Sequence, residues 1–104
     1  PIFIQDRKTM ANCGLVSIII GVDLNLKKLT IPPIVDTYGF MPGGHKAVVL
    51  KRISDFISKD LPKKLSSSLK KENIQEYIKH VALRMYDEEK VRHPITIPTV
   101  LIIK

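Results

Sequence analysis

The stretch LVSIIIGV, at residues 15–22, decides the fold of this chain. Only Ser17 and Gly21 interrupt a run of large, mostly β-branched apolar residues, and the run is shorter than an ordinary helix. A run of this kind predicts a buried β-strand. Because it contains no proline and is the most apolar strand candidate, we expect it to lie at the centre of a sheet.

Two further strands are predicted, at residues 29–38 and 95–103, and both contain proline. Proline has no backbone N–H group and removes a hydrogen bond from a strand ladder, so it occurs mainly on edge strands or at bulges. We therefore expect these two strands to flank the central one. The short polar segment at residues 23–28 predicts that the first two strands form an antiparallel hairpin.

Between the second and third strands, apolar residues recur every three or four positions, which is the spacing of one helical face. Pro62 predicts that the first helix stops or kinks there, and Asn73 is the expected N-cap of the second. Pro94 prevents the second helix from continuing. The predicted apolar faces are Val49, Ile53, Phe56, Ile57 and Leu61 in the first helix, and Ile74, Ile78, Val81 and Met85 in the second.

These elements predict an α+β fold in the order ββααβ, with a three-stranded β-sheet covered on one face by two α-helices. The length of 104 residues suits one compact core, so residues 1–104 are expected to form a single domain. The other face of the sheet has no predicted cover. Because apolar residues populate both sides of the central strand, we expect this open face to find a partner.

Composition narrows the class and location of the protein. Hydrophobic residues make up 44% of the chain, too many for a disordered tail, yet no apolar run approaches the roughly 20 residues that span a bilayer. No secretion signal follows Pro1, and Cys13 is the only cysteine, so no internal disulfide can form. We expect a cytoplasmic protein with no membrane contact. The missing initiator methionine indicates a piece of a longer chain.

A net charge of +7 suits a polyanionic partner, and much of the excess is local. Residues 59–71 contain five lysines and one aspartate. A solvated lysine-rich surface explains these residues equally simply and is favoured, because no aromatic residue within the segment offers a stacking surface. The candidate RNA-binding residues are Lys59, Lys63, Lys64, Lys70 and Lys71.

The joint YGFMPGGHK, at residues 38–46, connects a predicted strand to a predicted helix. Backbone amides at a helix start can hold a phosphate, and Gly43, Gly44 and Lys46 are the residues available for such a site. Their spacing matches neither the Walker pattern nor the dinucleotide-binding pattern. A strand-to-helix turn that needs positive φ is the favoured interpretation.

No set of residues predicts catalysis or a metal site. His45, His80 and His93 are far apart, and none has a histidine or cysteine partner at the spacing of zinc ligands. The acidic run at residues 87–89 points around a helix rather than converging, and Arg84 beside it is expected only to form surface ion pairs. We therefore expect no catalytic residue, no metal and no cofactor in this segment.

An ordered set of landmarks runs almost from end to end of the chain. The landmarks are residues 5–8, residues 14–23, Gly39-Phe40, residues 92–94 and Ile97-Pro98. Through this set the chain resembles the C-terminal domain of ribonuclease J, a bacterial ribonuclease of the metallo-β-lactamase type. Residues 41–44, which follow the Gly-Phe pair, depart from the family pattern, so we expect a divergent member.

The resemblance implies a parent enzyme of RNA processing and decay, with 5′-to-3′ exonuclease and endonuclease activity and a histidine-rich site for two zinc ions. None of that zinc motif lies in these residues, so no catalytic position is carried over. The implied role of this chain is a non-catalytic domain that supports self-association, as a dimer or tetramer, and full activity of the parent on RNA. The alternative is a self-contained basic RNA-binding module that uses residues 59–71.

Overall fold

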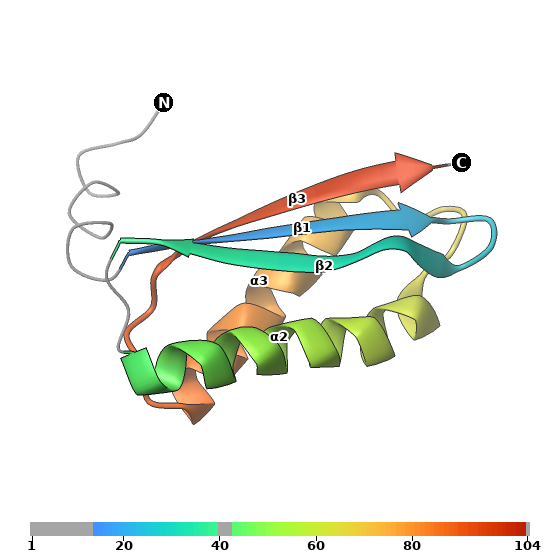
Figure 1. Ribbon diagram of the computed structural model, residues 1–104. Helices are drawn as coiled ribbons and strands as arrows, with labels where there is room; N and C mark the ends of the chain where they lie inside the picture. Colours follow the sequence, from blue (N-terminus) through green and yellow to red (C-terminus); the bar gives the residue numbers. More distant parts are fainter. Residues whose placement is uncertain (1–13, 40–42, 104) are drawn as a thin grey trace.

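The computed structural model describes residues 14–39 and 43–103, leaving aside the side chains of residues 43–46 (Figure 1). The described elements follow the order ββααβ, which confirms the predicted α+β fold. They are β1 (Leu15–Asp23), β2 (Lys28–Tyr38), α2 (Gly43–Lys64), α3 (Lys71–Glu88) and β3 (Ile95–Ile103).

The strands form one mixed sheet in the order β2-β1-β3. β1 is central, antiparallel to β2 and parallel to β3, so both strands that contain proline lie at edges as predicted. Ile95 donates its N–H to the carbonyl of Gly14, beside β1. Successive residues of a strand direct their N–H groups to opposite sides, so the nitrogen of Pro98 faces the free edge of β3. The hydrogen that proline lacks there removes no hydrogen bond to β1.

β2 forms a bulge opposite Ile20, where its two prolines stand. Ile19 pairs with Ile34 and Gly21 pairs with Ile31, so two prolines of β2 face one residue of β1. The strands approach so closely here that a Cβ atom on Gly21 would lie 2.6 Å from Oγ1 of Thr30 and 2.8 Å from Cγ1 of Ile31. Glycine is therefore required at position 21 by lack of space.

Helices α2 and α3 cover one face of the sheet and leave the other open (Figure 1). α2 packs against β2, α3 packs against β3, and the helices contact each other. Every second side chain of β1, from Val16 to Val22, is fully buried beneath them. Phe56, predicted on the buried face of α2, is only partly buried. The helices supply Val49, Ile53, Ile57, Leu61, Ile74, Ile78, Val81, Ala82, Met85 and Tyr86 to the core.

The helix limits differ from the prediction by a few residues. α2 runs through Pro62 and ends at Lys64, because a proline this close to the end removes little of the helix. α3 begins at Lys71 with Lys70 as N-cap, so the prediction of Asn73 as N-cap is wrong. Oδ1 of Asn73 instead accepts the N–H of Lys70 at 3.1 Å, reaching back from the third helical position. Within the described part of the chain, neither helix is long and apolar enough to cross a membrane.

Tyr86 links α3 to β3 by a hydrogen bond. Its side chain is buried, and its hydroxyl lies 2.8 Å from Oγ1 of Thr96. Burial raises the pKa of Tyr86 to about 12, although the hydrogen bond to Thr96 acts in the opposite direction. The folded chain therefore holds this phenol in its neutral form.

We expect Gly21→Ala to lower the free energy of unfolding by about 1–3 kcal/mol, because the new methyl group has no room beside Thr30 and Ile31. Ser17→Ala changes the same strand on its open face and should alter that free energy by less than about 0.5 kcal/mol. Urea unfolding followed by circular dichroism measures both variants. Equal stabilities for Gly21→Ala and the unchanged chain would contradict the close approach at the bulge.

The free energy of unfolding should fall as the pH rises above 10. Tyr86 ionises near 10 in the unfolded chain but stays protonated to about 12 when folded, so in this range the folded state binds a proton that the unfolded state has lost. Tyr86→Phe should therefore show a smaller loss of stability between about pH 9 and about pH 11. Tyr38→Phe, at an exposed position, is the matched control, and an identical pH dependence in all three proteins would refute the role of Tyr86.

Candidate functional site

His80, His93 and the acidic run at residues 87–89 make separate local contacts. His80 is exposed and lies 3.7 Å from a carboxylate oxygen of Glu76, whereas Nε2 of His93 lies 2.6 Å from Oδ1 of Asp87. Arg52 of α2 binds the rest of the acidic run, at residues 88 and 89, and both carboxylates raise its pKa. Among residues 14–39 and 43–103, no three His, Cys, Asp or Glu side chains gather to hold a metal ion.

The joint at residues 38–46 lies largely outside the described residues. Gly39 has a φ of 83°, the left-handed conformation that favours glycine, which supports the turn predicted there. The helix begins at Gly43. The phosphate hypothesis for Gly43, Gly44 and Lys46 remains a prediction, because the side chains of residues 43–46 are not described. The landmarks at residues 5–8, with Cys13 and Phe40, also fall outside the described residues.

The open face of the sheet is apolar along most of its length. Ile97, Leu101 and Ile103 of β3 are 45%, 49% and 52% exposed, and Ile34 and Tyr38 of β2 are also exposed. Large apolar side chains that share one exposed face are typical of an interaction site. Across β2, β1 and β3, the rows are Tyr38–Leu15–Ile95, Asp36–Ser17–Ile97 and Ile34–Ile19–Thr99, followed by Leu101 beside Gly21 and Ile103 beside Asp23.

The five candidate RNA-binding lysines belong to the helical layer and its connection, away from the open sheet face. All five are exposed. Lys59, Lys63 and Lys64 lie in the last turns of α2, while Lys70 is the N-cap of α3 and Lys71 its first residue. The structure thus brings them to the end of α2 and the start of α3, and RNA binding by them remains a prediction.

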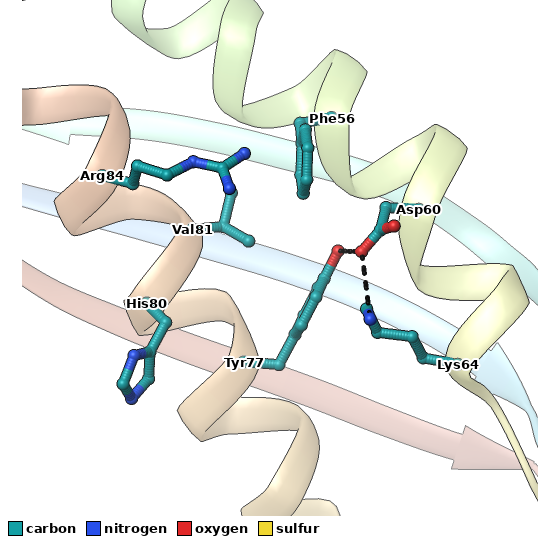
Figure 2. A pocket seen from close by; sticks show the side chains of 7 residues that line it. All are labelled: Phe56, Asp60, Lys64, Tyr77, His80, Val81 and Arg84. Carbon is teal, nitrogen blue, oxygen red and sulfur yellow. Dashed lines mark hydrogen bonds and ion pairs between the residues drawn. The ribbon is translucent and has the colours of Figure 1, made fainter. Parts of the chain in front are cut away.

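A groove of about 590 Å³ lies between α2 and α3, and Lys64 is one of the residues that line it (Figure 2). The hydroxyl of Tyr77 donates to Oδ2 of Asp60 at 2.7 Å, and Nζ of Lys64 lies 3.9 Å from the same oxygen. Burial and then the hydrogen bond to Asp60 hold the pKa of Tyr77 well above its ordinary value. The side chain of Tyr77 is therefore a neutral donor, and buried Val81 lines the groove beside it.

Phe56 and Arg84 form the other part of the groove. The guanidinium carbon of Arg84 lies 4.5 Å from the centroid of the Phe56 ring, and Figure 2 shows the guanidinium lying against that ring. Nε of Arg84 also lies 3.7 Å from Oε2 of Glu88. A second hollow, of about 240 Å³, shares Phe56 and includes Lys59. Phe56 thus borders both hollows, and the planar cation of Arg84 lies beside its ring in the groove.

Sequence reasoning missed the groove, although it had identified most of its residues. It assigned Phe56 and Val81 to the apolar helix faces and Arg84 to surface ion pairs. The available signal was the spacing of four and three residues from Tyr77 through Val81 to Arg84, which places these side chains along one side of α3. Only the packing of α2 against α3 brings them to Phe56 and Asp60.

The family model for the ribonuclease J C-terminal domain matches residues 2–103, nearly the whole chain. The match includes every strand and helix described above and confirms the resemblance predicted from the landmarks. No curated protein matches the chain.

Proposed function

Because the chain belongs to the ribonuclease J C-terminal domain family, we propose that it is the non-catalytic C-terminal domain of a ribonuclease J-like enzyme of RNA processing and decay. In this role it supports self-association of the enzyme. The surface through which two copies meet is the open face of the sheet.

The apolar character of that face is the observation that carries the proposal. Ile34 and Tyr38 at one edge, with Ile97, Leu101 and Ile103 at the other, expose about half of their surfaces. Removing apolar surface from water is favourable by about 25 cal/mol per Å². Two sheets can pack face to face in this way with their side chains interdigitated, as in a β-sandwich.

A second copy is the partner that the face fits best. A two-fold axis places the same patch on both sides of an interface, so apolar rows meet apolar rows and no opposite charge is needed. The carboxylates of this face lie towards its margins, with Asp36 on edge strand β2 and Asp23 at the end of β1. Such an arrangement leaves the centre of the face, around Ile19, free of charge.

The activity of the parent is assigned to another part of the enzyme. In the family, a separate catalytic domain holds two zinc ions and cleaves RNA as a 5′-to-3′ exonuclease and an endonuclease. Our proposal gives this chain no step in that reaction. It contributes by joining copies of the cytoplasmic enzyme into a dimer or tetramer, which sets the arrangement of the catalytic domains.

The variant Ile97→Lys/Leu101→Lys should weaken self-association of the 104-residue chain by about 100-fold or more, because each interface would bury lysine charges without partners. Leu26→Lys introduces one lysine charge at an exposed leucine in the turn between β1 and β2, away from the open face, and should associate like the unchanged chain. Sedimentation velocity over a range of protein concentrations measures all three.

Two results would contradict this assignment. One is a monomer at all concentrations for both the 104-residue chain and the parent enzyme, and the other is undiminished association of the double variant. A chain that begins at Gly14 distinguishes the possible occupants of the face. Association should persist in it if a second copy covers the sheet, and its loss would assign the contact to residues 1–13.

A further inference from the structure

We propose that the groove between α2 and α3 is a binding site for single-stranded nucleic acid. A base stacks on the guanidinium of Arg84, which lies beside the ring of Phe56, and the adjoining phosphates contact Lys64 and its lysine neighbours. This site lies on the helical layer and does not depend on the proposed self-association through the sheet.

The first argument is the placement of cations along the groove. Lys64 and Arg84 lie towards opposite ends of it, as Figure 2 shows, and their side chains are 56% and 53% exposed. Lys59 lines the adjoining hollow. Cations that are spread along a strip fit a chain of phosphates, whereas one small anion requires cations that converge on a point.

The second argument is the planar guanidinium of Arg84. Guanidinium groups stack on bases as aromatic rings do, and the guanidinium carbon of Arg84 lies 4.5 Å from the centroid of the Phe56 ring, which limits its movement. Its contact with Glu88 fixes the side chain from the Nε side. A base that stacks here therefore loses less entropy than it would on a mobile arginine.

The third argument is the state of the carboxylate that lines the groove. Asp60 would repel phosphate if its charge were free. It instead accepts a hydrogen bond of 2.7 Å from the hydroxyl of Tyr77 and lies 3.9 Å from Nζ of Lys64. The ion pair with Lys64 offsets the charge of Asp60, so the positive excess beside the groove comes from the exposed lysines at 59, 63, 70 and 71.

These features favour single strands over duplexes and over acidic proteins. In a duplex the bases are stacked on one another, so the Arg84 plane would find no free base. A peptide of acidic residues alone would satisfy the lysines but has no flat group to place against Arg84. The aromatic surface that the lysine segment lacks in sequence is thus supplied by the fold.

The test is fluorescence anisotropy of the 104-residue chain with labelled oligouridine and oligothymidine of about 12 nucleotides. We expect Arg84→Ala to weaken binding about 5- to 150-fold, the range for loss of one stacked base. Arg84→Lys keeps the charge but removes the plane, and it should lose nearly as much. Lys64→Ala should reduce the salt slope by about 1 between about 50 mM and about 200 mM salt.

Lys79→Ala is the matched control. Lys79 is on α3 but lines a different hollow, beside Leu83, Ile95 and Thr96, so its loss should change affinity less than about two-fold. The monomeric sheet variant Ile97→Lys/Leu101→Lys should bind the oligonucleotides like the unchanged chain, which separates this site from self-association.

Several outcomes would overturn the site. They are equal losses for Arg84→Ala and Lys79→Ala, full binding by Arg84→Lys, and a duplex or polyglutamate that binds as well as the single strands. Absence of binding at low salt would have the same consequence. Preference for oligouridine over oligothymidine would identify RNA as the ligand, and equal affinities would leave single strands of either type.

Discussion

The structure depends on one constraint, which is that β1 carries large apolar side chains on both of its faces. Its alternate side chains from Val16 to Val22 are buried against α2 and α3, and each such burial contributes about 1.5–3 kcal/mol. Leu15 and Ile19 point the other way, into a face that no helix of the described chain covers. The hydrophobic effect that stabilises the core therefore also favours burial of the apolar side chains on the open face. The proposed contact between copies would bury them.

Most of the fold could be predicted because its signals are local. The nearly unbroken apolar run of β1 identified the central strand. The prolines at positions 32, 33 and 98 identified the edge strands, since proline cannot donate a hydrogen bond to a strand ladder. The three-to-four-residue spacing of residues such as Ile53 and Ile78 identified the buried helix faces. The N-cap of α3 was placed three residues late, because Asn73 acts from inside the helix instead of before it.

The groove could not be predicted, because it exists only where two helices meet. Tyr77 and Asp60 are seventeen residues apart, and nothing in the sequence fixes how α2 crosses α3. The lysine segment was visible in the sequence, but its aromatic complement lies on other turns of the helices, at Phe56 and Tyr77. The two proposed surfaces consequently differ in origin. The sheet face follows from alternation along β1, whereas the groove follows from helix packing.

The central claim is that a second copy covers the open face of the sheet, and isoleucine methyl NMR over a range of protein concentrations tests it most directly. The methyl signals of Ile34, Ile97 and Ile103 should shift or broaden as the concentration rises, because these side chains pass from water into an interface. The signals of Ile18 and Ile53, buried under the helices, should stay unchanged. Open-face signals that do not respond to concentration would contradict the account.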